Sequence, residues 1–491
     1  MTLQQYWQPC VTTRVCMRDK VTAFSALVRE FHETATGTEH GLASNPFARI
    51  EGGRLRLRRE PRQSEPEGTA ALRQLVRRDL ARVRIEQLLM EVDTHCGFSR
   101  HLAPSMADPS NGDAGMLLTP ERHDSALMAA LVAHGTTLGI SAMADSPADL
   151  TVRMLQHVSR TCLRDETIRR AHAAIVNYHR ALAVSRYWGE GQVASSDGQR
   201  FRVRESSLLA AFYPQYFGYY DRAVSVYTHL SDQYSVLSTQ VISCAEREAL
   251  YVLDGLLEND TELPIHAHIV DTHGYTDHVF GLCFLLGFSF MPRLKNLAAR
   301  RLFKPAGSPE EGLFGSRSYA QLDALFSGTS DLNLIVEQWE GLARVATSLK
   351  NRVVSANIIV RRLVSSSPSN RLAKALTHLG QLVKTIYLRR FLNDSALRQQ
   401  VHTQLNGGES RQDVAQRIFF ADPGMFRSGD YYQMMNRASC LRLLSNAVLV
   451  SNPLHIARVL EYAKAQGQAF TPEAIAHVSP LAYRHVIVNG T

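Results

Sequence analysis

The stretch Ile265–Phe280 reads IHAHIVDTHGYTDHVF and constrains the fold more than any other part of the chain. Its first half alternates Ile265, Ala267 and Ile269 with two histidines, which is the period-two pattern of a strand buried on one face. The strand pattern stops at Asp271, where a polar turn begins. A carboxylate at the tip of a buried strand is costly unless it is solvated, paired or bound to a metal ion. The pattern therefore marks Asp271 as a candidate functional residue.

The positive charge of the chain is concentrated in one segment. The chain has 491 residues, room for several domains, and a net charge of +8, but Gly341–Gln400 alone holds eleven Lys or Arg and one acid. A local basic excess is typical of a surface that binds a nucleic-acid backbone. The segment could also be an ordinary solvated helical surface, although acids at i, i+4 would normally balance its charge.

The cysteines and the apolar runs bear on the compartment. Seven cysteines are scattered without a CxxC pair, which favours a reducing compartment and argues against a zinc ribbon or a disulfide framework. The N-terminus lacks the apolar core of a signal peptide. The longest apolar run, Val279–Pro292, has about fourteen residues, whereas a bilayer needs about twenty. We expect a cytoplasmic protein without a membrane segment.

Hydrophobic periodicity divides the chain into five regions of an α/β protein. They are an unassigned N-terminal segment and linker, a helical region, a mixed sheet, a long basic helical insertion and a final set of helices, at 1–70, 71–187, 188–304, 305–404 and 405–491. Before the strand that ends at Asp271, strands are expected at 192–196, 199–204, 223–230 and 236–243. A Gly407-Gly408 pair predicts a break before a helix at about 409–420.

Asp197 stands in the sequence GQVASSDGQRF, where a short strand is expected to end and Gly198 permits a turn. On these residues alone, an Asp-Gly turn is favoured over a functional carboxylate. The strand that follows places three arginines on one face. A basic sheet face beside an acidic strand tip suits a phosphate backbone that approaches metal-bound carboxylates. The three arginines are Arg200, Arg202 and Arg204.

The histidines before Asp271 allow a second interpretation, because HAHIVDTH is similar to the HxHxDH cluster of zinc hydrolases. The spacing differs, since two residues separate His268 from Asp271. In an unbroken strand, His266 and His268 also point to the face opposite Asp271. Strand histidines, buried or on the surface, are therefore favoured over a zinc site.

Glu409 has a pattern that supports two interpretations. On a helix that begins there, Val414 and Ile418 lie roughly opposite Glu409, which shares a stripe with Asp413 and Gln416. Such a stripe is typical of a solvated face. A carboxylate that lines an open groove filled with DNA gives the same pattern, so periodicity leaves both possibilities open.

The aromatic run Phe212–Tyr220 reads FYPQYFGYY. It could stack nucleic-acid bases, but such runs more often pack against sheets and turns.

Three motifs, in this order, resemble those of the transposases of replicative class II bacterial transposons, the Tn-three family. They are SSDGQRF around Asp197, VDTHGYTDHVFGL around Asp271 and LNGGESRQDVAQRIFF around Glu409. The flanking stretches LLMEVDTHCGFSRH, YVLDGLL and TSLKNRVVSANIIVRRL agree. The similarity runs from about residue 45 to the C-terminus of a chain about half as long as family members. It departs at Gly407 and Ser451, where the family usually has a basic residue and a tryptophan.

The resemblance implies a ribonuclease-H-like (DDE) catalytic domain, interrupted by the long helical insertion and preceded by a mostly helical region. Asp197, Asp271 and Glu409 would hold two Mg²⁺ ions, for which Mn²⁺ can substitute. The implied reactions are hydrolysis at the transposon 3′ ends and transfer of the freed 3′-OH into target DNA, by a homodimer. The basic residues expected to hold the DNA backbone without reading its sequence are Arg200, Arg202, Arg204, Lys350, Arg352, Arg361 and Arg362.

Two hypotheses from other classes stay open. The chain could be a truncated, non-catalytic DNA-binding remnant that interferes with a full-length relative by co-assembly. It could also be a ribonuclease-H-like nuclease unrelated to mobile DNA. Inverted repeats beside the gene would favour the transposase, and a frameshifted upstream reading frame would favour the remnant.

Overall fold

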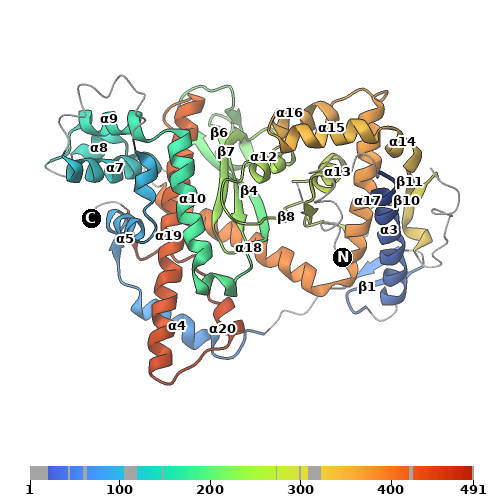
Figure 1. Ribbon diagram of the computed structural model, residues 1–491, viewed down its shortest axis with the longest axis horizontal. Helices are drawn as coiled ribbons and strands as arrows, with labels where there is room; N and C mark the ends of the chain where they lie inside the picture. The colour runs from blue at the N-terminus through green and yellow to red at the C-terminus, as the bar shows by residue number, and fades with distance from the viewer. Residues whose placement is uncertain are drawn as a thin grey trace.

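The computed structural model describes residues 20–42, 45–52, 54–58, 64–103, 119–145, 149–272, 274–297, 300–307, 322–419 and 424–488. A mixed sheet stands at the centre of an elongated body, with one group of helices on each side (Figure 1). The fold is thus α/β, as the periodicity predicts.

The central sheet contains six strands: β4 (Val193–Val203), β5 (Ala211–Phe212), β6 (Arg222–Ser231), β7 (Val236–Ser243), β8 (Ala267–Val270) and β9 (Ser289–Phe290). The antiparallel strands lie in the order β7-β6-β4, and β8 and β9 continue the sheet parallel to β4. Short β5 pairs with the start of β6. The strands expected at 223–230 and 236–243, and the strand before Asp271, are confirmed.

Strand β4 corrects the expectation of a strand end and an Asp-Gly turn at Asp197. It runs unbroken for 11 residues, and Asp197 and Gly198 pair in register with Thr228 and Tyr227 of β6. Gly198 serves close packing instead of a turn. A Cβ at this position would lie 2.2 Å from Oε1 of Glu248, so a larger residue here would displace that carboxylate.

Where the structure describes the region expected to be helical, 71–187, it is built mainly of helices. It contains α4 (Thr69–Asp79), α5 (Ile85–Cys96), α7 (Pro120–Gly135), α8 (Ile140–Ala144), α9 (Val152–Cys162) and α10 (Asp165–Ala181). Short 3-10 turns η1 (Phe98–Leu102) and η3 (Ala183–Tyr187) follow α5 and α10, and β3 (Val83–Arg84) pairs with β12 (Val486–Ile487). Val224, Val226 and Val241 bury one face of the sheet in the same core as this group.

Helix α19 (Tyr431–Ala465) crosses that face of the sheet and is followed by α20 (Pro472–Ala476). Among the described helices, α19 is the one long and apolar enough to cross a bilayer. Its most apolar window is 67% buried inside the protein, as expected of a core helix. Asn446 ties it to the sheet, because its side chain exchanges hydrogen bonds of 2.8 and 2.9 Å with the backbone of Val236.

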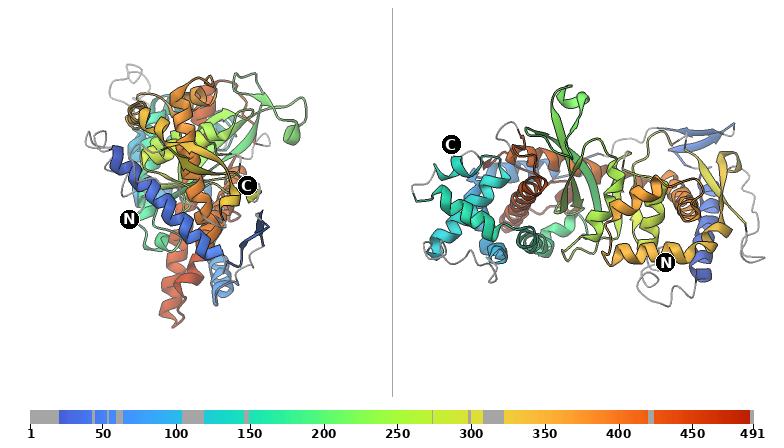
Figure 2. Two further views of the ribbon diagram at one scale, coloured as in Figure 1. Left: turned by 90° about the vertical axis from the view of Figure 1, so that its right-hand side faces the viewer. Right: turned by 90° about the horizontal axis from the view of Figure 1, so that it is seen from above.

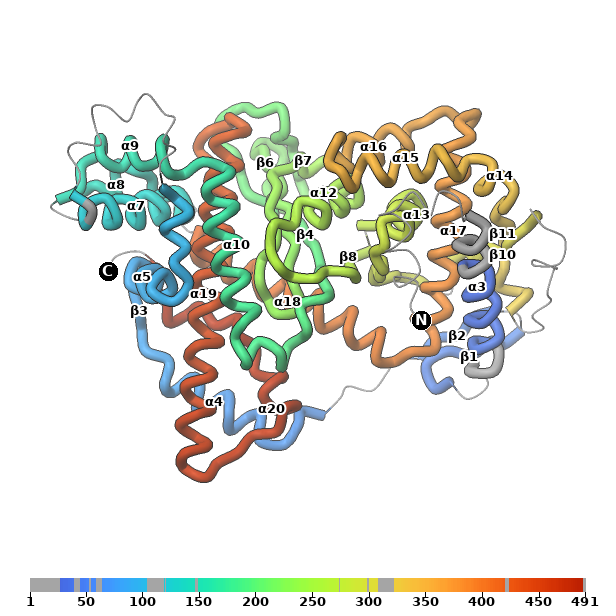
Figure 3. The backbone as a smooth tube through the Cα atoms, in the orientation of Figure 1, coloured from blue at the N-terminus to red at the C-terminus, as the bar shows by residue number. Residues whose placement is uncertain are grey.

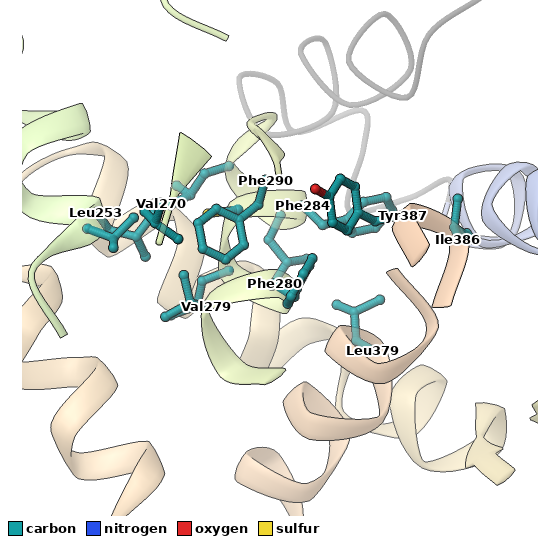
Figure 4. Packing of buried hydrophobic residues seen from close by; sticks show 14 of the residues in the cluster. Leu253, Val270, Val279, Phe280, Phe284, Phe290, Leu379, Ile386 and Tyr387 are labelled. Carbon is teal, nitrogen blue, oxygen red and sulfur yellow. The ribbon is translucent and has the colours of Figure 1, made fainter. Parts of the chain in front are cut away.

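The opposite face of the sheet packs against α12 (Val252–Leu257) and α13 (Asp277–Leu286), and α13 packs in turn on α17 (Arg371–Asn393). Figure 4 shows Phe280 of α13 between Phe290 of the sheet and Tyr387 of α17. The ring centroids lie 4.9 and 6.1 Å apart, respectively. At Gly380 the two helix backbones touch, since a Cβ there would lie 1.8 Å from the Asp277 carbonyl oxygen.

Part of the unassigned segment 1–70 belongs to this second core. Helix α3 (Lys20–Leu42) runs beside α17 (Figure 3), and Phe31 lies under the guanidinium of Arg389 at 3.9 Å. Strands β1 (Ala48–Glu51) and β2 (Arg54–Leu57) form a hairpin nearby.

The insertion begins with the parallel pair β10 (Leu302–Ala306) and β11 (Phe326–Asp331) and continues with α14 (Leu332–Glu337), α15 (Trp339–Lys350) and α16 (Ala356–Val364). Helix α18 (Ser395–Ile418) then runs straight through Gly407 and Gly408, so the expected break there is wrong. Gly407 instead allows close packing, because a Cβ would lie 2.9 Å from the Tyr234 ring. The expected boundary at 404/405 therefore falls inside one helix.

Candidate active site

Asp197 and Asp271 occupy neighbouring positions, the first within β4 and the second directly after β8. The parallel register of β4 and β8 ends with the pair Ser196 and Val270, and each aspartate is the next residue of its strand or chain. Residues paired in this way point to the same face. Burial raises the pKa of Asp197 above its usual range, and the negative charge of Asp271 raises it further. The structure thus brings two of the three expected carboxylates together.

Hydrogen bonds fix the orientation of the Asp197 carboxylate. Its Oδ1 accepts the N–H of Gly198 at 2.8 Å, and its Oδ2 accepts Nε2 of Gln412 at 2.8 Å. Gln199 donates in turn to the Gln412 carbonyl oxygen at 3.1 Å. Helix α18 is therefore docked onto the strand that carries Asp197.

Asp271 is less constrained. Its Oδ1 is buried and has no hydrogen-bond partner among the described residues, and Nε of Arg293 lies 3.9 Å away. The next residue, Thr272, donates to the Arg293 carbonyl oxygen at 3.0 Å and fixes the loop. A buried carboxylate oxygen without a donor is costly, and a cation is a partner that would satisfy it.

Glu248 is a third carboxylate at this position, and no motif or periodicity in the sequence predicts its role. It begins the 3-10 turn η4 (Glu248–Leu250) after β7, and its carboxylate packs against Gly198, with Nη2 of Arg200 at 3.9 Å. Burial raises the pKa of Glu248 to about 7, and the charges of Asp197 and Asp271 contribute to the rise. Its neighbour Glu246 points elsewhere, to an ion pair with Arg361, and no periodicity separates two glutamates in so short a connection.

Glu409 lies on the exposed face of α18, one turn before Gln412. Val414 and Ile418 are buried on the far side, as the helical pattern predicts. Within the described parts of the chain, no three Asp, Glu, His or Cys side chains approach the geometry of a metal site. The structure therefore does not bring Glu409 into one cluster with the two aspartates.

Arg411 adds a buried positive charge next to Asp197. Burial lowers the pKa of Arg411 to about 10, while the charge of Asp197 opposes that shift. Within the described part of the chain, its Nε has no hydrogen-bond partner. Together with Gly408 and Gln412 it lines a cavity of about 20 Å³ beside Asp197, large enough for a single water molecule.

The histidines near the site are core residues. His268 is fully buried and its Nε2 lies 2.8 Å from Oγ of Ser196. Burial holds the pKa of His268 far below its usual range, and that of His229 at about 4. Nε2 of His229 donates to the Val252 carbonyl oxygen at 3.0 Å. His268 is thus a buried strand residue, which is one of the two placements that the sequence allows for it.

The arginines of β4 lie as the alternation predicts. Phe201 and Val203 are buried, while Arg202 and Arg204 are exposed and Arg200 is half-buried.

Several of the basic residues in the insertion are paired with acids from other segments. Arg352 lies 3.5 Å from Asp260, and Arg361 lies 2.7 Å from Glu246. Among the basic residues proposed to hold DNA, Lys350 and Arg362 are exposed and make no ion pair within the described structure. The excess charge of the segment is thus partly neutralised across the fold instead of along one helix.

The chain matches known transposases. Residues 87–491 match the model of the Tn3 transposase DDE domain. The transposase for transposon Tn1546 of Enterococcus faecium is 34% identical over 445 residues, which are 90% of this chain and 43% of that protein. The transposase for transposon Tn501 of Pseudomonas aeruginosa is 35% identical over 412 residues, or 84% and 40%. That for transposon gamma-delta of Escherichia coli K12 is 32% identical over 431 residues, or 87% and 41%. The chain thus spans less than half the length of these curated relatives.

Proposed function

Because the chain belongs to the Tn3 transposase family, we propose that it is the catalytic region of a DNA transposase. It would hydrolyse phosphodiester bonds at transposon 3′ ends and transfer the freed 3′-OH into target DNA. The observation that carries the proposal is the pair Asp197 and Asp271. Both directly follow the last register pair of the parallel strands β4 and β8, and the charge of Asp271 raises the pKa of Asp197. The proposed setting is the bacterial cytoplasm, with a homodimer as the active form.

The strand order supports a ribonuclease-H-like catalytic fold. Three antiparallel strands, β4, β6 and β7, are followed along the chain by α12 and by β8, which returns to the free edge of β4 and lies parallel to it. This order places the first and fourth long strands side by side, with Asp197 on one and Asp271 directly after the other.

A DDE domain implies dependence on a divalent metal ion, and the residues present suit Mg²⁺. Hard carboxylate oxygens are the ligands that this ion prefers. Asp197, Asp271 and Glu248 share a region in which their charges repel one another, and no described residue donates a hydrogen bond to Oδ1 of Asp271. A cation relieves both costs. We therefore assign metal binding to Asp197 and Asp271, with Glu248 beside them and Glu409 as the third family ligand.

Bound divalent ions supply charge neutralisation at the phosphate and activation of the attacking oxygen. The chain's own groups supply position. Gly198 and Gln412 hold the Asp197 carboxylate in one orientation. Arg411 and Arg293 place positive charge beside the two aspartates, where a phosphate would add negative charge. Other basic residues would bind the DNA backbone at positions outside the carboxylate site. They are Arg202, Arg204, Lys350, Arg352, Arg361 and Arg362.

A joining assay tests the proposal. A labelled duplex that carries a recessed 3′-OH is incubated with supercoiled plasmid, the chain and Mg²⁺. Covalent transfer of label to the plasmid is expected for the wild type and for the exposed control variant Glu461→Gln. It should disappear with EDTA and in Asp197→Asn, which keeps the shape of the side chain. Joining that survives in Asp197→Asn would overturn the assignment. A wild type that binds DNA but neither joins it nor binds Mn²⁺ would favour the DNA-binding remnant.

A further inference from the structure

The connection between β4 and β6, residues 204–221, forms a hairpin that extends away from the body of the protein (Figure 2). It includes β5 and the short helix α11 (Pro214–Phe217). We call it the aromatic hairpin, because the run FYPQYFGYY lies within it. The sequence favours packing for this run, whereas most of its rings are exposed in the structure.

Several aromatic rings of the hairpin face solvent. Tyr219 is 78% exposed and Tyr220 is 94% exposed, while Phe212 and Tyr216 are more than half exposed. Large apolar groups gathered in one exposed patch usually mark an interaction surface. The aromatic hairpin therefore contributes little to the core and presents ring faces outward.

The base of the hairpin is fixed, so the rings are presented from a defined position. Arg222 donates to Oγ of Ser206 at 2.8 Å, and Arg202 lies 3.4 Å from Asp221. The carboxylate of Glu205 accepts the N–H of Gly429 at 3.1 Å. These contacts close the hairpin across its foot and tie it to the segment that precedes α19.

Arginines lie against the same rings. The Cζ of Arg200 lies 4.4 Å from the Tyr213 ring centroid and 5.5 Å from that of Tyr216. Arg202 and Arg222 lie 5.4 and 5.2 Å from the rings of Phe217 and Phe212. Residues 200–222 contain four arginines and two acids, so this segment has a net positive charge. Alternating cations and aromatic rings suit a polyanion with flat bases, because the cations attract phosphates and the rings stack bases.

The hairpin is continuous with the carboxylate site. The guanidinium of Arg200 contacts Tyr213 on one side, and its Nη2 lies 3.9 Å from the Glu248 carboxylate on the other. Tyr213 and Tyr216 stack at 5.5 Å and extend that contact toward the tip. A strand with one phosphate at Asp197 would therefore have its neighbouring bases near these rings.

We propose that the aromatic hairpin stacks unpaired bases of the DNA strand that enters the carboxylate site. The inference rests on the proposed function, since it takes DNA as the partner. Unpaired bases are favoured over duplex DNA because tyrosine faces stack on exposed bases, whereas the outside of a duplex offers mainly phosphates. The contact is expected to be indifferent to base identity, because every base has a face that stacks.

The test compares single strands and duplexes by fluorescence anisotropy, with the full chain in EDTA so that no cleavage occurs. The probes are a labelled thymidine 20-mer and a random duplex of the same length. The double variant Tyr219→Ala/Tyr220→Ala should bind the single strand at least about tenfold more weakly, from the loss of two stacking contacts. Its duplex affinity should change less than about twofold, and Tyr219→Phe/Tyr220→Phe should keep single-strand binding because the ring faces remain.

Tyr462→Ala, an exposed tyrosine on α19, serves as the control and should bind like the wild type. An equal loss on both probes would overturn the proposal in favour of general backbone contact. Unchanged binding to both would also overturn it, and sedimentation would then show whether the patch serves self-association. The binding measurement needs no metal ion, so its outcome is independent of the joining assay. If the wild type joins DNA and Asp197→Asn does not, but the double variant binds single strands as the wild type does, the role of the hairpin is refuted and the proposed function is not.

Discussion

The substitution Glu248→Gln tests the electrostatics of the site most directly. Gln keeps the shape of the side chain that packs against Gly198 but cannot carry the charge that Asp197 and Asp271 repel. In the wild type, burial and these two charges raise the pKa of Glu248 from 4.5 to about 7. The charged form is therefore disfavoured in the folded protein at neutral pH.

The sign and size of the effect follow from proton linkage. Between pH 4.5 and 7 the folded chain binds a proton at Glu248 that the unfolded chain has released, so the free energy of unfolding falls as pH rises and levels off above pH 7. One pKa unit corresponds to 1.36 kcal/mol, so the shift is worth about 3 kcal/mol at most. Because the side chain is only 18% exposed, solvent screening removes little of this value. Glu248→Gln should therefore equal the wild type near pH 4.5 and exceed it by up to about 3 kcal/mol at pH 8.

The assay is urea unfolding of both proteins from pH 4.5 to 8, in EDTA and then in Mg²⁺. Glu461→Gln, an exposed glutamate on α19, should parallel the wild type at every pH. Mg²⁺ should stabilise the wild type more than Glu248→Gln, because the ion binds the charged form. A difference between the two proteins that stays constant with pH would refute the argument, since a constant difference reports packing rather than charge repulsion.

Other variants test the remaining parts of the structure by unfolding and by salt titration. Gly380→Ala should lose about 1–3 kcal/mol or more from the collision with α13, whereas Gly37→Ala, with open space around it in α3, should gain up to about 1 kcal/mol of helix stability. Lys350→Gln should reduce the slope of log affinity for duplex DNA against log salt by about 1, and Arg352→Gln, whose partner is Asp260, by less. Glu409→Gln should change the free energy of unfolding by less than about 0.5 kcal/mol but weaken Mn²⁺ binding. If the variant shows the same metal-dependent rise in melting temperature as the wild type, Glu409 is not a ligand.

The sequence predicts the elements whose periodicity is strong and misses what depends on tertiary contacts. The alternation before Asp271 and within β6 and β7 is enough to locate those strands, because one face of each is buried. The turn predicted at Gly198 and the helix break predicted at Gly407 are both wrong, because glycine usually indicates a turn or a break. Both are instead points of close approach, to Glu248 and to Tyr234. No local pattern distinguishes these uses of glycine.

Dependence on tertiary contacts also decides which residues of the candidate active site could be predicted from the sequence. Asp197 and Asp271 could be predicted as partners because family motifs and strand order place them together. Glu248 could not, because its position depends on how the turn after β7 folds over Gly198. The basic segment looked unbalanced because its acids, such as Asp260 and Glu246, come from distant parts of the chain.

Glu409 and Gln412 show how the missing third ligand relates to the two aspartates. At 100° per residue, three positions along α18 separate their side chains by about 60° around the axis. The Gln412 amide occupies Oδ2 of Asp197 at 2.8 Å. A cation bound at that oxygen would compete with the amide, but α18 is also docked through Gln199, which donates to the Gln412 carbonyl oxygen, and through Gln404, which donates to Ser195. The position on α18 that reaches Asp197 is therefore Gln412, and Glu409 stands about 60° away from it around the helix axis, which is why the structure does not bring Glu409 into one cluster with the two aspartates.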